Sequence, residues 1–467
     1  MLPSYRVRYS RSSFDDMTSR AGKKEDRHTR LTQTPVPRLI MELSVPTIIS
    51  MLVTGIYNTA DTYFVGRIST NATAAVGVVF SVMALIQALG FFCGHGSGNY
   101  MSRKLGAGEL QEAREMAATG FVLAFIIGIT FMILGFVFLT PVSYALGAMP
   151  EFIGDTQNYM RIILVGAPFM MAQFVVNNQL RFQGAPVYAM VGLVAGALIN
   201  IGLDPLLMFG LKMGVTGAAV ATVCSQIISF VILFLGSRRG ENVRVELKNT
   251  RLNAHYLFEI VNGGLPSLFR QGLMSISTIA LNHTAGIYGG AAAIAGMSVT
   301  TRVSMLANSA LIGFGQGYQP MCSFNYGARL YKRVKQGYWF CVKYGTIFLL
   351  AVSVIGFSFA PQIIHFFRED ADVIAIGTVA LRFQAVAFPA GAFLVMSNMM
   401  AQSIGKGVRA SVLASARTGF FFLPLIYLLP RMFGLFGVEI TQACADVLSF
   451  LLAIPIARSI LNEMKEE

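Results

Sequence analysis

The sequence predicts an all-α integral membrane protein, with twelve transmembrane helices arranged in two six-helix lobes. Three observations support this fold class. Only 13% of the residues are charged and the mean hydropathy is +0.60, whereas a soluble domain carries about 25% charged residues. Many long segments contain no charged residue at all. Landmarks in the first half of the chain also recur in the second half at a nearly constant spacing.

The uncharged segments are long enough to cross a bilayer, which requires about 20 mostly apolar residues in a helix. No Asp, Glu, Lys or Arg occurs in 68–102, 116–150, 213–237 or 344–367. These segments are continuously apolar instead of alternating, which argues against a β-barrel. We expect twelve helical spans in chain order, near 40–64, 73–100, 115–139, 157–180, 186–209, 214–236, 257–286, 291–324, 337–362, 376–402, 410–430 and 436–458.

An internal repeat relates the two halves, which align when the chain is shifted by 219 to 221 residues. Pro46 then falls on Pro266, and Asn177 falls on Asn398. Each half holds six spans, an even number, so the halves share one orientation and are related by a pseudo-two-fold axis along the membrane normal. Two such lobes around a central cleft are typical of transporters that work by alternating access.

Basic residues are distributed unequally between the two sides of the membrane. With the N-terminus inside, the inner segments hold 26 Lys and Arg residues and the outer loops hold four. This asymmetry follows the positive-inside rule and predicts a multi-pass protein of the plasma (inner) membrane with both termini in the cytoplasm. The net charge of +13 therefore reflects topology, and we expect no nucleic-acid partner.

The domain organisation follows from the spans and the charged segments. We expect a disordered cytoplasmic tail at 1–37, an N-lobe at 38–237, a cytoplasmic linker at 238–255, and a C-lobe with a short cytoplasmic C-terminus at 256–467.

No glycine-rich phosphate loop ending in Lys-Ser or Lys-Thr is present, so an ion gradient is the expected energy source. The five cysteines lie in or beside apolar spans without paired spacing, which predicts neither a disulfide nor a metal site. We expect no cofactor besides the coupling ion, and no catalytic residues. An integral membrane enzyme is the alternative from another class, but no His-rich or serine-nucleophile motif supports it.

Two acidic residues lie deep inside the predicted spans, where an ionised group is costly and therefore a candidate for function. Asp61 is about 30 Å along the first helix and Asp204 about 27 Å along the fifth, so both should lie in the outer half of the first lobe. Two carboxyl groups in one low-dielectric pocket disfavour double ionisation, so the pair can take up and release a proton. A static hydrogen-bonded pair is the alternative. The equivalent positions of the second lobe are Leu281 and Pro424.

The second lobe carries different ionisable residues inside its spans. Arg302 and Asp446 each lie about ten residues into a span that enters from outside, so we expect them to form an ionic pair near the midplane. A contact to an anionic substrate and a second coupling site are the alternatives for this group, which also contains Arg270 and Arg417.

Methionine clusters occur in the symmetric fourth and tenth spans. Because flexible thioether side chains can repack around varied apolar ligands, we expect the clustered methionines to line a drug cavity. They are Met170, Met171, Met396 and Met399.

The chain resembles the multidrug and toxic compound extrusion (MATE) family over residues 35–458. The resemblance rests on several segments together: 44–46 and 57–66 in the first span, 200–210 around the fifth, and 214–219 at the start of the sixth. It implies V-shaped packing of the two lobes and outward antiport of cationic or amphipathic compounds, coupled to a cation.

In its pair of acids, Asp61 and Asp204, the chain resembles the DinF-like branch of this family and is close to MepA-type bacterial exporters. The resemblance implies that Asp61 is the coupling site and that Pro46 marks the bend of the first helix. The NorM-like branch instead carries a glutamate in span seven, which this chain lacks in the apolar middle of that span. The implied coupling network around the two aspartates consists of Tyr57, Asn177, Asn200 and Thr222.

We therefore expect a monomeric secondary transporter in the lipid bilayer that exports small-molecule drugs or toxic organic cations. A proton is the favoured coupling ion and sodium is the alternative, since carboxylate, Asn and Thr oxygens suit either. A lipid-linked saccharide flippase of the same superfamily is the alternative function, but no basic cluster is evident in the first-lobe cavity.

Overall fold

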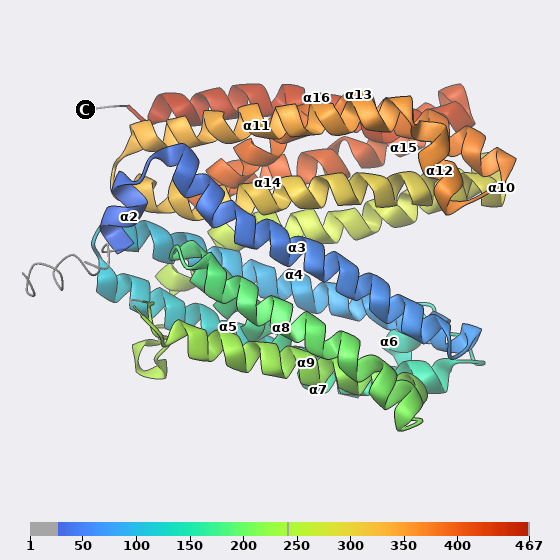
Figure 1. The fold of residues 1–467 in the computed structure, drawn as a ribbon, viewed down its shortest axis with the longest axis horizontal. Coiled ribbons are helices and arrows are strands. Elements are labelled where there is room, and N and C mark those ends of the chain that lie inside the picture. The colour runs from blue at the N-terminus through green and yellow to red at the C-terminus, as the bar shows by residue number, and fades with distance from the viewer. Residues whose placement is uncertain (1–26, 241, 466–467) are drawn as a thin grey trace, which may run out of the picture.

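The computed structural model describes residues 27–240 and 242–465, except for the side chains of residues 58–60, 62, 63 and 70. Within that part the chain is helical and contains no strand (Figure 1). The first lobe contains α3 (Val36–Gly66), α4 (Thr70–Gly106), α5 (Leu110–Val137), α6 (Leu139–Ala145), α7 (Ile153–Phe182), α8 (Pro186–Pro205), the π-helix η1 (Leu206–Gly210) and α9 (Gly214–Ser237).

The second lobe follows a connecting segment that contains the short helix η2 (Leu247–Asn249). Its elements are α10 (Ala254–Gly327), α11 (Tyr331–Ser358), α12 (Ala360–Phe367), α13 (Ala371–Ser403), α14 (Gly407–Ser415), the π-helix η3 (Ala416–Phe420), α15 (Phe422–Phe433) and α16 (Leu435–Glu463).

Helix α10 is two antiparallel arms joined at Gly290, whose backbone is non-helical with φ 62° and ψ −153°. Both ends of α10 meet the end of α4: Glu259 of the first arm pairs with Arg103, and Gly327 of the second arm packs on the Arg103 backbone. Ten other helical segments among the described residues are long and apolar enough to span a membrane. With the two arms they make the twelve helices in two lobes that the sequence predicts, so this expectation is confirmed.

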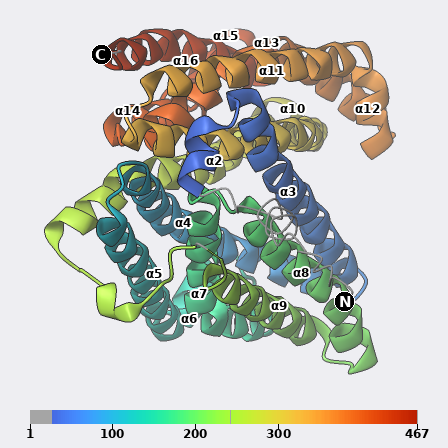
Figure 2. The ribbon, with the colours of Figure 1, turned by 60° about the vertical axis from the view of Figure 1, so that its left-hand side comes forward.

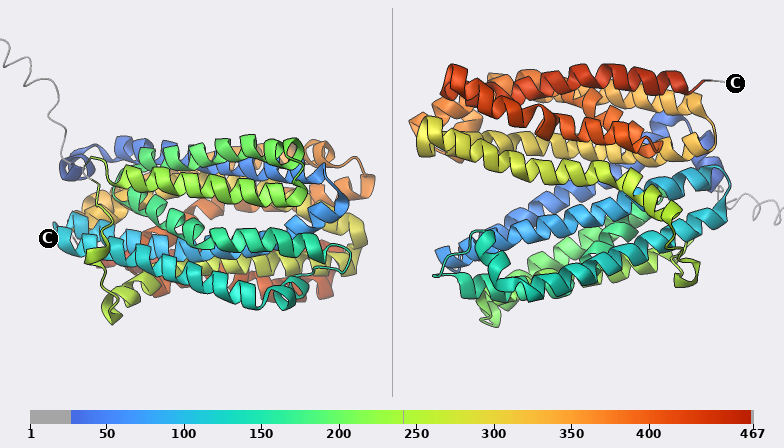
Figure 3. Two further views of the ribbon diagram at one scale, coloured as in Figure 1. Left: turned by 90° about the horizontal axis from the view of Figure 1, so that it is seen from below. Right: turned by 180° about the vertical axis from the view of Figure 1, so that it is seen from behind.

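The two lobes form a V (Figure 3, right). They meet where α4 crosses the second arm of α10, and glycines allow the two backbones to touch there. A Cβ at Gly106 would overlap the carbonyl oxygen of Phe324, and a Cβ at Gly327 would overlap the carbonyl oxygen of Arg103. These two contacts are equivalent under the internal repeat. We call this end of the molecule the closed end and the opposite end, where the lobes diverge, the open end.

The first helix of each lobe begins against the other lobe. Leu39 and Leu43 of α3 are fully buried in the core of the second lobe, whereas Val65 at the far end of α3 is buried in the core of the first. The first arm of α10 repeats this arrangement, because Ile260 packs with first-lobe residues and Leu281 with second-lobe residues. The predicted boundary at residue 38 therefore separates the chain segments but not the packing units.

Part of the predicted tail is structured, which corrects the expectation of disorder for 27–37. Helix α2 (Arg27–Gln33) lies at the junction of the two lobes (Figure 2). Arg27 donates to Asn242 Oδ1 at 2.7 Å on one side, and Asn325 donates to the Leu31 carbonyl at 3.0 Å on the other. Leu31 is fully buried, so apolar packing holds the helix in place. Residues 1–26 lie outside the described residues.

The glycine crossing predicts a specific stability defect. Gly327→Ala places a methyl group against a backbone oxygen that cannot rotate away, so we expect a loss of about 1–3 kcal/mol from overpacking. The thermal midpoint of the detergent-solubilised protein should fall. Gly272→Ala, in the same helix but with open space around its Cβ, is the matched control and should not lower the midpoint. Equal behaviour of the two variants would contradict the close approach.

Candidate functional site

A cavity of about 420 Å³ lies between the two lobes. One wall comes from α3, α4, α7, α8 and α9, and the other from both arms of α10 together with α13, α14, η3 and α16. Aromatic and thioether side chains such as Phe91, Phe174 and Met274 alternate with amides such as Gln173 and Gln384. A mostly apolar lining with a few polar groups suits amphipathic organic ligands.

The methionine prediction is wrong for three of the four residues. Met170 lines the cavity, but Met171 and Met396 are fully buried in the cores of the two lobes. Met399 is buried against Gly315. Met170 and Met171 are adjacent and point about 100° apart, so only one of them can face the cavity. Met396 and Met399 share one face of α13, but that face packs on Gly315 of α10 and not on the cavity. The methionines that do line the cavity occur singly along several helices, at Met51, Met83, Met170, Met274, Met297 and Met305.

The structure brings Asp61 and Asp204 together in the first lobe. They are close enough to interact electrostatically, and both also act on Tyr57 and Tyr159. Asp204 is fully buried and accepts a long hydrogen bond of 3.4 Å from Asn200 Nδ2 at its Oδ1. Tyr57 extends from this group to the cavity wall, so the acids lie directly behind the cavity.

Around the two acids, several buried oxygens make no hydrogen bond with any described residue. They are Asp61 Oδ1, Asp204 Oδ2, Asn200 Oδ1, Thr222 Oγ1, Tyr159 Oη and Gln226 Oε1. Leaving a buried polar atom unpaired costs about 1–3 kcal/mol, so such a group calls for an explanation. Four of these atoms are carboxylate or amide oxygens, which only accept hydrogen bonds. The group can therefore be satisfied by a proton or by a small cation.

The predicted network is only partly assembled in the structure. Tyr57, Asn200 and Thr222 surround the acids, whereas the amide nitrogen of Asn177 donates to the Ala189 carbonyl at 3.1 Å. Ala189 is 11 residues before Asn200 on α8, or about 16 Å away along the helix axis. Asn177 instead lines the cavity closer to the closed end, and its equivalent Asn398 makes the same bond to Ala410.

Two members of this group were missed from the sequence, Tyr159 and Gln226. Gln226 lies four residues after Thr222 on α9, so helical spacing could have indicated it. Tyr159 lies at the start of a long helix and carries no local signal. Only the packing of α7 against α9 places its hydroxyl beside the acids.

A change of helix type directly follows Asp204. Pro205 has no backbone N–H, so one hydrogen bond of α8 is lost there, and the chain continues as the π-helix η1. Short π-helical turns are frequent at functional sites, because they reorient the side chains around them. Pro46 lies inside α3 just after Leu43, the last residue of that helix in the second-lobe core.

The predicted pair of Arg302 and Asp446 is wrong. Arg302 is exposed, and Asp446 is instead bound by Arg417, whose Nε and Nη2 donate to Oδ1 and Oδ2 at 2.7 and 3.1 Å. Gln384 and Gln442 donate to the same carboxylate at 2.7 and 2.9 Å. The sequence predicted how far along their helices Arg302 and Asp446 lie, but not the direction in which the Arg302 side chain points. The structure therefore supports a paired role for Asp446 with a different partner.

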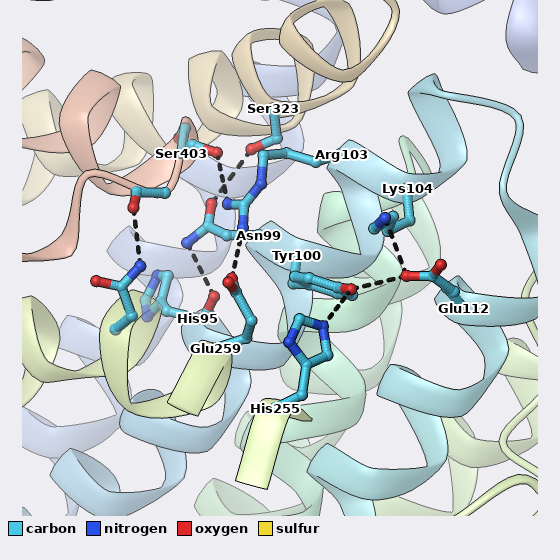
Figure 4. Close-up of polar contacts among 12 residues, drawn as sticks. His95, Asn99, Tyr100, Arg103, Lys104, Glu112, His255, Glu259, Ser323 and Ser403 are labelled. Carbon is cyan, nitrogen blue, oxygen red and sulfur yellow. Dashed lines mark hydrogen bonds and ion pairs between the residues drawn. The ribbon is translucent and has the colours of Figure 1, made fainter. Parts of the chain in front are cut away.

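The closed end is held by a second polar network (Figure 4). Arg103 of α4 donates to Glu259 Oε2 of the other lobe at 2.9 Å and to the Ser403 carbonyl at 3.2 Å. Ser323 donates to Asn99 Oδ1 at 3.2 Å, again between the lobes. These contacts, together with the glycine crossing, shut the cavity at this end.

The Arg417 pair allows a direct test of the corrected assignment. Arg417→Gln leaves the buried Asp446 carboxylate without its charge partner, so we expect a loss of about 3–5 kcal/mol. Arg302→Gln removes an exposed charge and should change stability by less than about 0.5 kcal/mol. Thermal unfolding of both variants in the same detergent gives the comparison. A larger loss for Arg302→Gln would restore the original pair.

The MatE family model matches twice, at residues 46–206 and 266–428, once in each repeat. The multidrug export protein MepA of Staphylococcus aureus strain MSSA476 is 26% identical over 440 residues, covering 93% of this chain and 96% of MepA. MepA of Staphylococcus saprophyticus is 27% identical over 425 residues, covering 89% of this chain and 92% of that protein.

The fold is also similar to that of a solved multidrug transporter structure. An outward-facing multidrug resistance MATE family transporter of the MOP superfamily superposes with a TM-score of 0.88 and 27% sequence identity, covering 96% of this chain and 100% of that chain. Because the family model covers more than half of the chain and both repeats, the chain belongs to the MatE family.

Proposed function

We propose that this protein is a secondary multidrug exporter of the plasma membrane that works by alternating access as a cation-coupled antiporter. The relatives that cover nearly the whole chain are multidrug export proteins and a multidrug resistance transporter. The amphipathic lining of the cavity between the lobes agrees with that substrate class. The family match favours the exporter over the flippase alternative.

The orientation follows from the basic residues. The linker at 238–255 and helix α2 both lie at the closed end, and with them most of the basic residues that the positive-inside rule assigns to the cytoplasm. The closed end is then cytoplasmic, and the cavity faces outward. The contacts of Arg103 with Glu259 and Ser403 act as the cytoplasmic gate, which must open to admit substrate from the cell.

The coupling site is the group around Asp61 and Asp204. The single observation that carries this assignment is the set of buried oxygens between α3, α7, α8 and α9 that have no hydrogen-bond partner among the described residues. A proton bound by the two carboxyl groups removes one negative charge from a buried pocket and supplies a missing donor. An ion bound there is linked to the cavity through Tyr57, which touches both.

Helix α3 is suited to transmit ion binding to the cavity. Its first part is fixed in the second-lobe core up to Leu43, whereas Asp61 lies in the first lobe. Pro46 sits between these two parts and lacks the N–H that would complete the helix, so bending there is less costly than elsewhere. Protonation at Asp61 then shifts the outer part of α3, closes the first-lobe side of the cavity and expels the substrate.

The acid pair gives the first functional prediction. Asp61→Asn cannot gain or lose a proton, so drug efflux driven by a pH gradient should fall to the level of protein-free vesicles. Asp204→Asn should also lower the coupled rate, since the carboxyl groups interact. The assay follows ethidium leaving preloaded proteoliposomes in acidified buffer. Glu151→Gln, an exposed acid of the same lobe, is the control and should keep the wild-type rate. Wild-type coupling in Asp61→Asn would refute the assignment.

The identity of the coupling ion is a separate prediction. Because two carboxyl groups share one buried pocket, we expect a proton gradient to drive ethidium efflux when no sodium is present. An inward sodium gradient at equal pH on both sides should give no efflux beyond that seen without a gradient. The reverse result would show that the same oxygens bind sodium.

A further inference from the structure

Two arginines from different lobes bind polar residues at the closed end of the cavity: Arg181 donates to Gln316 and Arg270 to Asn398, and both of these amides line the cavity. Arg181 is in the last turn of α7 and is 3% exposed, and Arg270 is on the first arm of α10 and lines the cavity. The two guanidinium groups are close enough to interact electrostatically, and both also act on His95. This concentrates positive charge deep between the lobes.

The described hydrogen-bond partners of these arginines are neutral groups. Arg181 donates to Gln316 Oε1, and at 2.7 Å to Asn178 Oδ1, and its Nη2 lies 3.3 Å from His95 Nε2. Its buried Nε has no partner among the described residues. Arg270 makes one long hydrogen bond of 3.4 Å to Asn398 Oδ1. Within residues 27–240 and 242–465, no carboxylate forms an ion pair with either arginine.

Other arginines inside the helical bundle differ in this respect. Arg103 pairs with Glu259 and Arg417 pairs with Asp446, in agreement with the rule that buried charges are paired. Two guanidinium groups that share one buried region, with no counter-charge among the described residues, repel each other, and the low dielectric around them strengthens that repulsion. The arrangement is costly for the protein alone, and an anionic group between them removes the cost.

The surrounding residues also offer hydrogen-bond donors to such a group. The Oε1 of Gln316 accepts from Arg181, which leaves its Nε2 as a donor, and Gln316 lines the cavity beside Arg270. Arg270 donates one N–H group to Asn398, and its other N–H groups can donate to a ligand. An arginine fork with an amide donor matches the geometry of a carboxylate, sulfonate or phosphate.

We propose that Arg270 and Arg181 form a binding site for the anionic group of an amphipathic ligand, whose apolar part packs on Phe91, Phe174 and Met274. The site extends the substrate range of the exporter from organic cations to anionic and zwitterionic amphiphiles, and in that sense it rests on the proposed function. Because the two arginines belong to different lobes, a bound anion also links the lobes at the closed end.

The test uses two xanthene dyes of similar size and opposite charge, fluorescein as the anion and tetramethylrosamine as the cation. Binding to the detergent-solubilised full chain is followed by fluorescence anisotropy. Arg270→Gln should weaken fluorescein binding at least about tenfold, equal to 1.4 kcal/mol, and should not weaken tetramethylrosamine binding. Arg181→Gln should act in the same direction. Arg302→Gln, which removes an exposed arginine from the same helix, is the matched control and should bind both dyes as the wild type does.

Retained tetramethylrosamine binding shows that a variant is folded. Unchanged fluorescein affinity in Arg270→Gln, or an equal loss in Arg302→Gln, would overturn the site. A test on the wild type does not depend on the folding of any variant: octanesulfonate should displace fluorescein, and octyltrimethylammonium should not. Displacement by both compounds alike would also overturn the proposal.

A further competition experiment distinguishes a lipid head group from a soluble amphiphile as the source of the anionic group. Nanodiscs that contain phosphatidylglycerol should compete with fluorescein if the natural ligand is a lipid head group, whereas octyl phosphate alone should compete if it is a soluble amphiphile. Competition by neither contradicts the site. Efflux of ethidium by the wild type is measured separately. If no efflux is seen, the dye-binding experiment still tests the anion site, and if dye binding fails, the efflux experiment still tests the exporter assignment.

Discussion

The close approach of α4 and the second arm of α10 is the constraint on which the rest of the structure depends. Glycine at positions 106 and 327 lets each backbone touch a carbonyl of the other helix. Without side chains between them, the two helices cross at one end and diverge toward the other, so the lobes form a V with a cavity between them (Figure 3). The same end of the molecule holds the pair of Arg103 and Glu259, and there Arg181 of the first lobe binds Gln316 of the second. The proposed gate thus lies in the region where the backbones of the two lobes approach most closely.

The internal repeat produces two similar backbones with different chemistry. Asn177 and Asn398 make the same hydrogen bond in the two lobes, to Ala189 and Ala410. At the position of Asp61, however, the second lobe has Leu281 within an apolar cluster. The buried carboxylates of the two lobes differ in whether their oxygens have hydrogen-bond partners. A carboxylate with all its partners, such as Asp446, needs nothing further and stabilises the fold, whereas unpaired oxygens of the kind around Asp204 leave a place for an exchangeable ion.

The buried arginines illustrate the same reasoning with the opposite sign. Arg417 is paired with a carboxylate, whereas the described partners of Arg181 are amides and an imidazole. Acceptor oxygens lie behind one wall of the cavity, and Arg270 lines its closed end without an ion pair among the described residues. The proposed binding of amphiphiles of either charge rests on that distribution, and the apolar lining of the cavity suits their shared hydrophobic part.

Sequence by itself determined the twelve spans, the repeat, the family and the depth of each charged residue, because composition and the 1.5 Å rise of a helix are local properties. The depth of each residue along its helix was sufficient to predict that Asp61 and Asp204 lie close together, since they are on neighbouring helices of one lobe. It was not sufficient for Arg302, Met171, Met396 or Met399, because the direction of a side chain around its helix depends on which distant helices pack there. Only the tertiary structure decided that Arg417 binds Asp446, that Tyr159 joins the acids and that Arg181 of the first lobe binds Gln316 of the second.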